Sequence, residues 1–386
     1  MKQGWEIAEF EKCLEKVTYT NKIQRKDFKE DGIYPIVSQE KDFINGYWDN
    51  EEDLFKVDKP VVIFGDHTQV IKFIDFDFVL GADGVKILKP KDKIDSKYFY
   101  YFLQNVDLGS LGYARHYRLL KEINIAYPKS LPEQQRIVSI LDEAFAAIAK
   151  AKANAEQNLK NAKELFESYL QGVFEKKGEG WEERKVNEIG NAQTGTTPKT
   201  AEKENYGDFI PFIKPADVDF SGIGDIRYDN EGLSEIGLKK GRKMESGSIL
   251  MVCIGATIGK VGFAEREVSC NQQINSLTVK KEFEPKFIYY AMTSKEFQDK
   301  VLLEGKGAQA TLPIINKSKW ENLTISFPKS KTEQKRFVEK FDALSIESQK
   351  LQEIYLKKLA DLEELKKSVL QKAFAGELKT ENNIAL

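Results

Sequence analysis

The stretch that decides the fold occurs twice in this chain. Residues 127–145 read YPKSLPEQQRIVSILDEAF, and residues 327–345 read FPKSKTEQKRFVEKFDALS. The Pro-Lys-Ser and Glu-Gln-x-Arg motifs recur at a constant offset of 200 (327 minus 127). The offset continues without a gap as far as Phe174 and Phe374. Such constancy indicates an internal repeat.

Each copy opens a long helix with one apolar seam. In the second copy, apolar residues alternate in steps of four and three, with only Ser348 and Lys358 off the pattern. They are Phe337, Phe341, Leu344, Leu351, Tyr355, Leu362, Leu365 and Val369. The first copy keeps the register with smaller residues, namely Ile137, Leu141, Ala144, Ile148, Ala151, Ala155, Ala162, Leu165 and Tyr169. This spacing is typical of a coiled coil, and helices from about Pro132 to Val173 would be roughly 60 Å long.

Connectivity predicts the direction of the two helices. The first helix leaves the first non-helical region and arrives at the second, so the second helix must run back along it. We therefore expect an antiparallel pair with a pseudo-two-fold axis, globular regions at opposite ends, and a chain end near Met1. The alternative is a pair of surface helices that pack on separate domains.

The two globular regions resemble each other. Both begin with Gly-Trp-Glu, at Gly4 and at Gly180. Residues 78–103 align without gaps at an offset of 189, which pairs Val79 with Val268 (268 minus 79). The β-branched runs at 59–74 and 247–263 predict buried strands, and the aromatic blocks at 95–105 and 285–300 have helical spacing. Each region is therefore expected to be a mixed α/β unit.

These patterns predict an α+β fold in which two mixed α/β domains are joined by a long antiparallel two-helix coiled coil. The expected boundaries are a first globular domain (1–128), a first long helix (129–175), a second globular domain (176–328, opening with a linker at 176–180), a second long helix (329–376) and a polar tail (377–386).

Composition excludes several classes of protein. The 386 residues carry 59 basic and 61 acidic side chains, so DNA contact requires a local basic face. No apolar run approaches the roughly 20 residues of a membrane span, and the start lacks a signal peptide, so we expect a cytoplasmic protein without membrane contact. Cys13, Cys253 and Cys270 predict neither a disulfide framework nor, with the two histidines, a metal site.

Motifs for catalysis are missing as well. Residues 255–261 imitate a phosphate loop, but the glycine spacing is one residue short and Val261 replaces the Ser or Thr that binds magnesium. No G-x-G-x-x-G follows a predicted strand, and no Asn/Asp-Pro-Pro-Tyr stretch occurs. We therefore expect neither an enzyme nor a bound cofactor.

Local clusters suggest contact with DNA instead. Arginine can donate two hydrogen bonds to guanine or to phosphate, and Gln or Asn can pair with adenine. The candidates in the first globular region are Arg115, His116, Tyr117 and Arg118, with Asp66, His67 and Thr68 in a turn. Those in the second are Thr196, Thr197, Lys199, Arg242, Lys243, Asn271, Gln272, Gln273 and Lys306. Solvated loops and buried turns are the competing interpretation for each cluster.

Together these features resemble the DNA-specificity subunit of Type I restriction–modification systems. The resemblance rests on the repeated P-K-S-x-x-E-Q-x-R and Gly-Trp-Glu motifs, on Thr-Gly-Thr-Thr-Pro at 194–198 and on Ser-Cys-Asn-Gln-Gln at 269–273. It implies two target-recognition domains, each reading half of a bipartite double-stranded DNA site, and helices that act as spacer and as docking surface for methyltransferase subunits. It also implies S-adenosylmethionine in those partners, and ATP with magnesium in a restriction (translocase) subunit. One departure is Lys16-Val-Thr-Tyr-Thr-Asn21, which replaces the Thr-Gly-x-Thr-Pro loop in the first region.

The residues themselves favour the same mechanism. Two inverted readers suit a duplex, and a rigid coil sets their separation, as dimer geometry does in helix-turn-helix proteins. Because the two regions differ at their turns, the DNA site should be asymmetric. A protein–protein scaffold with a coiled coil is the competing class, and a nuclease or methyltransferase acting alone is a third.

Overall fold

The structure is a computed structural model that describes residues 3–109, 112, 114–218, 226–305 and 313–378. It divides into two compact units, each of which is described separately. The first unit combines residues 1–155 with 357–386, and the second unit comprises residues 156–356. Each unit therefore contains one globular part and one end of each long helix.

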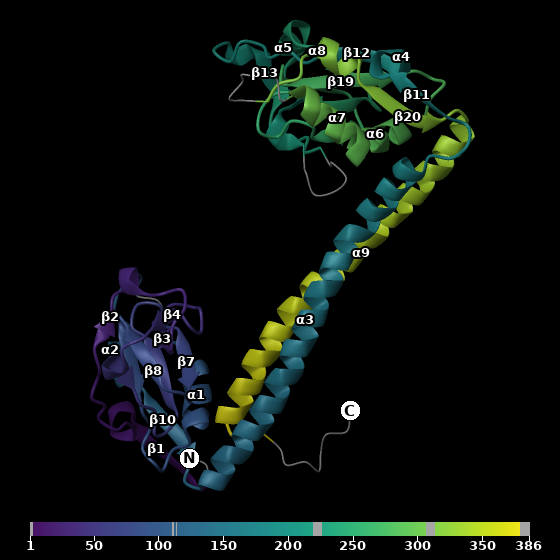
Figure 1. Cartoon of the computed structure of the whole chain (residues 1–386). Coiled ribbons are helices and arrows are strands. Elements are labelled where there is room, and N and C mark those ends of the chain that lie inside the picture. Colours follow the sequence, from purple (N-terminus) through teal and green to yellow (C-terminus); the bar gives the residue numbers. More distant parts are fainter. Residues whose placement is uncertain (1–2, 110–111, 113, 219–225, 306–312, 379–386) are drawn as a thin grey trace. The chain divides into compact units, whose positions relative to one another are not determined.

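The two long helices are α3 (Leu131–Lys176) and α9 (Lys331–Phe374), as the repeated stretch predicts (Figure 1). In the first unit, the start of α3 packs against the end of α9, and Lys152 forms an ion pair of 2.6 Å with Glu363. In the second unit, the end of α3 packs against the start of α9, and the rings of Phe166 and Phe341 lie 6.4 Å apart. The helices are therefore antiparallel in both units.

Alanines line much of the predicted seam. Ala155 and Ala162 of α3 are buried, and they allow the backbones to approach closely. Ser348, which interrupts the apolar pattern of α9, is also buried. Its hydroxyl donates a hydrogen bond to the carbonyl oxygen of Ala162. The seam thus accommodates a polar residue by using a backbone acceptor on the facing helix.

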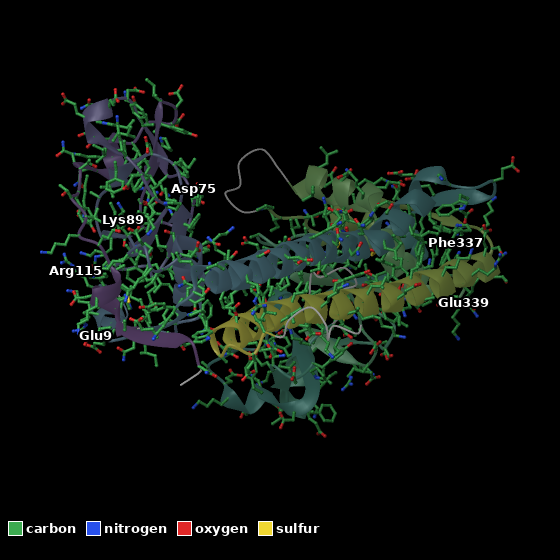
Figure 2. The ribbon with its side chains drawn as sticks, turned by 90° about the horizontal axis from the view of Figure 1, so that it is seen from below. Glu9, Asp75, Lys89, Arg115, Phe337 and Glu339 are labelled. Carbon is green, nitrogen blue, oxygen red and sulfur yellow. The ribbon has the colours of Figure 1, made fainter. Side chains whose placement is uncertain are left out.

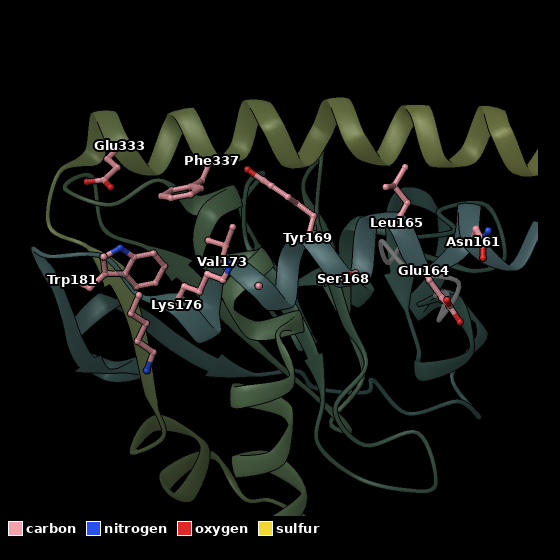
Figure 3. Close-up of a pocket in the computed structure, with 13 residues that line it drawn as sticks. Asn161, Glu164, Leu165, Ser168, Tyr169, Val173, Lys176, Trp181, Glu333 and Phe337 are labelled. Atoms are coloured by element: carbon pink, nitrogen blue, oxygen red, sulfur yellow. The ribbon is translucent and has the colours of Figure 1, made fainter. Parts of the chain in front are cut away.

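Two seam positions were predicted wrongly. Leu165 is 40% exposed and Leu365 is 47% exposed. In the second unit, the last turns of α3 direct Phe166, Leu170 and Phe174 into the core instead. Leu165 consequently lines an open groove of about 790 Å³ with Tyr169, Val173, Trp181 and Phe337 (Figure 3). A strict 3.5-residue period cannot describe a helix end that faces both a partner helix and a globular core.

The globular part of the first unit contains three small sheets. Their strands follow the order β2-β8-β3-β4 with β5 beside β8, β7-β6-β9, and β1-β10. The bounds are β1 (Trp5–Glu9), β2 (Lys22–Ile23), β3 (Tyr34–Val37), β4 (Gly46–Trp48), β5 (Leu54–Phe55), β6 (Val61–Gly65), β7 (Ile71–Ile74), β8 (Phe78–Gly81), β9 (Val85–Leu88) and β10 (Asn124–Pro128). The described α-helices of this part are α1 (Ser96–Gln104) and α2 (Tyr117–Lys121), and short 3-10 turns lie at Phe10–Cys13, Arg25–Asp27 and Glu51–Asp53.

Among the described residues, the second unit repeats this plan with the same number of strands and with more short helices. Its sheets have the orders β12-β19-β16-β17, β14-β13-β18-β15 and β11-β20. The strands are β11 (Trp181–Lys185), β12 (Gly190–Thr194), β13 (Tyr206–Ile213), β14 (Gly232–Leu233), β15 (Lys243–Met244), β16 (Ile249–Val252), β17 (Val261–Phe263), β18 (Val268–Cys270), β19 (Ile274–Val279) and β20 (Thr324–Pro328). The helices are α4 (Val186–Ile189), α5 (Glu235–Lys240), α6 (Pro285–Thr293), α7 (Lys295–Gly305) and α8 (Lys317–Glu321).

The two Gly-Trp-Glu motifs have one structural explanation. In the first unit, Trp5 on β1 pairs with Pro128 on β10. In the second unit, Trp181 on β11 pairs with Pro328 on β20. Each motif therefore forms the strand that lies beside the Pro-Lys-Ser segment from which a long helix begins.

The Glu-Gln-x-Arg motif connects each long helix to its globular part. The side chain of Gln134 is fully buried, and its amide oxygen accepts a hydrogen bond of 2.8 Å from the backbone N–H of Asp95. Gln334 is equally buried and accepts one of 2.8 Å from Glu284. Each glutamine also donates to the proline carbonyl that precedes its helix. The motif recurs because both helix starts need these backbone groups satisfied.

A second repeated contact lies about two helical turns further along each long helix. Tyr101 of α1 donates a hydrogen bond to Asp142, which also pairs with Lys97 at 2.8 Å. Tyr290 of α6 donates to Asp342 in the same way, and Lys286 pairs with Asp342 at 2.7 Å. These contacts join the segments that repeat at an offset of 189 to those that repeat at 200. In the described part of the chain, no helix combines the length and the apolarity that a membrane span requires.

Candidate nucleic-acid interface

Strand register brings several candidate residues of the first unit to one sheet edge. Gly65 at the end of β6 pairs with Val85 at the start of β9, so the turns at 66–69 and 82–84 lie side by side. The backbone N–H of Asp66 donates a hydrogen bond of 2.7 Å to the carbonyl of Gly84. We call the surface formed by these two turns and residues 115–118 the first turn edge.

The second unit has an equivalent surface. Val252 at the end of β16 pairs with Ile274 at the start of β19, and Cys253 donates a hydrogen bond of 2.8 Å to the carbonyl of Gln273. Thr194, which ends β12, pairs with Asn275 at the same edge. We call the surface formed by segments 195–199, 253–260 and 271–273 the second turn edge.

Segments that approach the two edges from later in the chain also correspond. In the first unit, the backbone N–H of His116 donates a hydrogen bond of 2.7 Å to the carbonyl of Asp66. In the second unit, Ile315 donates one of 2.9 Å to the carbonyl of Cys253. Helices α2 and α8 follow these bonds. The two surfaces therefore share a hydrogen-bonded frame, while their side chains differ.

Asp66 and the Arg-His-Tyr-Arg cluster, which are separated by about 50 residues, form one structural group. The carboxylate of Asp66 is buried and accepts a hydrogen bond of 2.8 Å from the backbone N–H of Tyr117. His116 is only 1% exposed, and its Nδ1 lies 3.1 Å from the carbonyl oxygen of Asp66. Asp66 and His116 thus hold the start of α2 against the turn, so they position the neighbouring arginines.

The two arginines are the accessible members of the cluster. Arg115, which is labelled in Figure 2, and Arg118 are exposed. Within the described residues, neither arginine takes part in an ion pair. Tyr117 between them is half-buried, and the ammonium groups of Lys86 and Lys121 lie 5.3 and 5.5 Å from its ring centre. Burial raises the pKa of the Tyr117 hydroxyl, so it stays protonated and able to donate.

Sequence reasoning missed three polar residues at the first turn edge, namely Gln39, Lys22 and Lys86. Gln39 accepts a hydrogen bond of 3.1 Å from the backbone N–H of His67, and its carbonyl accepts one of 2.6 Å from the hydroxyl of Thr68. Lys22 ends its side chain 3.5 Å from the carbonyl of Val85. Burial and the neighbouring ammonium of Lys86 lower the pKa of Lys22. Two neighbouring cations suit an anionic ligand such as phosphate.

At the second turn edge, the Thr-Gly-Thr-Thr-Pro loop and the Cys-Asn-Gln-Gln turn lie in contact. An added Cβ at Gly195 would stand 2.2 Å from the carbonyl oxygen of Asn271, so only glycine permits this approach. The backbone N–H of Thr196 donates to the carbonyl of Cys270 at 2.9 Å. Thr197 donates its hydroxyl hydrogen bond to the side-chain oxygen of Gln272.

The three residues of the second turn differ in accessibility. Asn271 is buried, and its amide donates a hydrogen bond of 3.0 Å to the side chain of Gln273. Gln272 is exposed and Gln273 is partly exposed. Asn271 therefore shapes the turn, whereas Gln272 is the most accessible amide for a ligand.

The basic residues of the second unit are largely occupied by carboxylates. Lys243 forms ion pairs with Glu267 at 2.8 Å and with Glu245 at 3.3 Å, and hydrogen bonding to Glu267 raises the pKa of Lys243. Lys199 lies 3.7 Å from Glu202. Such exposed pairs are weak, so a phosphate would compete with them.

Two further candidates complete the comparison with the sequence. Arg242 donates a hydrogen bond of 2.7 Å to the carbonyl of Thr194, which places its guanidinium beside the loop at 194–198. Lys306 lies outside the described residues. Among those that are described, no group of three or more His, Cys, Asp or Glu side chains is placed to hold a metal ion.

Comparison with known proteins identifies related sequences. The family model for the Type I restriction modification DNA specificity domain matches residues 3–160 and 178–356. The EcoR124I/EcoR124II specificity subunit of the Type I restriction enzyme from Escherichia coli is 27% identical over 343 residues, which are 84% of this chain and 83% of that protein. The Type I restriction enzyme HindI specificity subunit from Haemophilus influenzae is 31% identical over 183 residues, which cover 45% and 39%.

Solved structures share the fold. A chain from a structure titled "Structural basis underlying complex assembly and conformational transition of the type I R-M system" has a TM-score of 0.71 and 16% identity, with coverage of 98% and 99%. The HsdS subunit from Thermoanaerobacter tengcongensis has a TM-score of 0.58 and 16% identity, with coverage of 97% and 98%. The expected fold class, two mixed α/β repeats with two long helices, is confirmed.

Proposed function

This chain belongs to the Type I restriction–modification DNA specificity family, and on that premise we propose that it is a specificity subunit that reads an asymmetric, bipartite site in double-stranded DNA. Each turn edge reads one half of the site. Base edges in the major groove offer the donors and acceptors that Arg115, Arg118 and Gln272 can match. We propose that the protein acts in the cytoplasm.

The main support for this proposal is the backbone hydrogen-bonding pattern that the two edges share. Asp66 and Cys253 make the same backbone bonds to the following turn, and residues 116 and 315 bond to them in the same way. The residues displayed on that frame differ, because the first edge carries Arg115 and Arg118, whereas segments 195–199, 253–260 and 271–273 of the second edge contain no arginine. One scaffold that carries two different sets of polar side chains fits a reader of two different half-sites.

The long helices supply the spacing and the partner surface in this proposal. A helix of 46 residues such as α3 is about 69 Å long at 1.5 Å per residue, or roughly two turns of B-DNA at about 34 Å each. Methyltransferase subunits dock on the helices and bring S-adenosylmethionine, and a restriction subunit brings ATP and magnesium. The chain itself performs no catalytic step.

A domain replacement tests the division of specificity. Residues 181–328 are replaced by the corresponding segment of a relative with known specificity, and the methyltransferase partner is co-expressed in a host without its own methylation. Sequencing that detects modified bases then gives the recognition site. We expect one half-site to change while the other half-site and the gap persist. A change in both halves would refute separate reading.

DNA binding by the assembled complex is tested directly by salt titration. Because phosphate contacts release counterions, affinity for duplex DNA should fall steeply as salt rises. A protein that only joined two partner proteins would show no such dependence and no preference between duplex sequences.

A further inference from the structure

One buried charge in the first unit is not explained by the turn edge itself. Lys72 lies on β7 and is only 4% exposed. Lysine is rarely buried to this degree, because removing an ammonium group from water is costly unless hydrogen bonds replace the lost solvent. Its surroundings therefore indicate what the fold gains from it.

All described hydrogen-bond acceptors of this ammonium belong to one segment, residues 38–45. Lys72 Nζ donates to the carbonyl oxygens of Asp42 and of Phe43, the latter at 3.4 Å, and to the side-chain oxygen of Asn45 at 3.1 Å. That same oxygen of Asn45 accepts a hydrogen bond of 2.8 Å from the backbone N–H of Ser38. Asn45 thus closes the segment on itself, and Lys72 fixes it to the sheet.

The segment carries Gln39 to the first turn edge. Gln39 bonds to His67 and Thr68 through its side-chain and backbone oxygens. An added Cβ at Gly65 would lie 2.9 Å from Cβ of Gln39, and one at Gly84 would lie 2.7 Å from its Oε1. The turns at 66–69 and 82–84 therefore both pack against Gln39, and a shift of segment 38–45 would displace them.

In the second unit, the position that corresponds to Lys72 is occupied by glycine. On β7, Lys72 pairs with Ile63 of β6, and the matching pair on β17 and β16 is Gly262 with Leu250. An added Cβ at Gly262 would meet Ile226 at 2.8 Å. At this position, the described residues of the second unit therefore place an apolar side chain where the first unit has the ammonium group of Lys72.

The charges around Lys72 are compatible with an anchoring role. The carboxylates of Glu40 and Asp42 lie in the same segment, and Arg25 forms an ion pair with Glu40. Burial lowers the pKa of Lys72 to about 8, and the two carboxylates act against this shift. The ammonium is thus charged at neutral pH, where it can donate three hydrogen bonds at once.

We propose that Lys72 is a positioning residue that fixes segment 38–45, and through Gln39 the first turn edge, so that this unit reads its half of the DNA site accurately. The role rests on the proposed function. Lys72 itself touches no DNA. It acts by holding the residues that face the duplex, and its loss affects one half-site only.

The first test measures the segment without any assumption about DNA. Lys72→Met keeps the length of the side chain and removes its donors. In hydrogen–deuterium exchange of the full chain, segment 38–45 and the turn at 66–69 should exchange about tenfold to a hundredfold faster, because they lose several hydrogen bonds. Peptides from 247–279 should be unchanged. Unchanged exchange at 38–45 would overturn the proposal.

A matched pair of variants at Asn45 separates anchoring from general damage. Asn45→Asp keeps an acceptor for both Lys72 and Ser38, whereas Asn45→Ala removes it. We expect Asn45→Ala to reproduce the faster exchange of Lys72→Met and Asn45→Asp to remain close to the original protein. Equal effects of both Asn45 variants would refute the anchor.

The second test reads the half-sites. The variants are co-expressed with the methyltransferase partner, and modified bases are mapped by sequencing. Lys72→Met and Asn45→Ala should accept additional bases in one half-site, with the other half unchanged. Relaxation of both halves would overturn the positioning role. If the original protein directs no sequence-specific methylation, the proposed function fails, while the exchange experiment still decides whether Lys72 orders the segment.

Discussion

Replacing the two buried glutamines by alanine should destabilise the two units separately. Gln134 makes three hydrogen bonds, to Asp95 at 2.8 Å, to Lys93 at 3.0 Å and to Pro128 at 2.7 Å. Gln334 makes two, to Glu284 at 2.8 Å and to Pro328 at 2.8 Å. Each bond satisfies a backbone group at the junction between a long helix and its globular part.

The bonds determine the size of the effect. A buried polar group that loses its partner costs about 1–3 kcal/mol. Only the bonds to the carbonyls of Pro128 and Pro328 are fully buried, and the others are partly buried, so the lower end of that range applies. Gln134→Ala leaves three backbone groups without this partner and costs about 3 kcal/mol, while Gln334→Ala leaves two and costs about 2 kcal/mol. Gln157→Ala is the matched control, because Gln157 lies exposed on α3 and, among the residues that the structure describes, its side chain bonds to Asn161 alone. That variant should cost no more than about 0.5 kcal/mol.

Urea unfolding combined with hydrogen–deuterium exchange measures these effects. Gln134→Ala should accelerate exchange around 93–105 and leave 282–293 unchanged, and Gln334→Ala should do the reverse. The junction argument is refuted if Gln157→Ala destabilises as much as Gln334→Ala. It is equally refuted if each glutamine variant loosens both segments.

The remaining predictions concern DNA reading and pH. Arg115→Ala or Arg118→Ala should cost about 1–3 kcal/mol of binding free energy and relax base discrimination at one position of the first half-site. Lys243→Ala should weaken binding to all duplexes alike and reduce the slope of log affinity against log salt by at most about one unit. Competition binding at several salt concentrations distinguishes the two kinds of variant. Removing one heptad from each long helix should change the gap between half-sites in methylation maps and leave the half-sites intact. Burial lowers the pKa of Lys72 from 10.5 to about 8, so the folded state loses that proton first as the pH rises. The free energy of unfolding relative to Lys72→Met should therefore rise by up to about 3 kcal/mol between about pH 8 and 10.5 in urea unfolding, and a constant difference across that range would contradict the lowered pKa of the buried ammonium.

Much of the fold follows from the sequence because its determinants are local and repeated. The 200-residue offset and the heptad spacing were sufficient to predict α3, α9 and their antiparallel packing, which is confirmed. The offset of 189 likewise identified matching strands in the two globular regions. The exposed Leu165 and Leu365 show the limit of this reasoning, since a seam period says nothing about which turns of a helix face a globular core.

The candidate site was less accessible to sequence reasoning. The contact between Asp66 and Tyr117 depends on strand register and on a chain crossing that no local pattern encodes. Gln39 lies on a segment that has no recognisable motif and a single basic residue, Lys41, so only its tertiary contacts reveal it. The pairing of Lys243 with Glu245 could be read from adjacent positions, but its pairing with Glu267 comes from a neighbouring strand.

The first unit is formed by two segments that lie far apart in the sequence, and this has a consequence for its folding during synthesis. Residues 1–155 leave the ribosome early, but their packing partners on α9 follow about 200 residues later. At about 5–20 residues per second, that delay is about 10–40 s. Phe374 contacts Tyr98 and Phe102 at ring distances of 5.3 and 5.5 Å, so the core of the first unit is completed only after the end of α9 has been translated. A stop codon upstream of the Phe374 codon would therefore damage the core of the first unit.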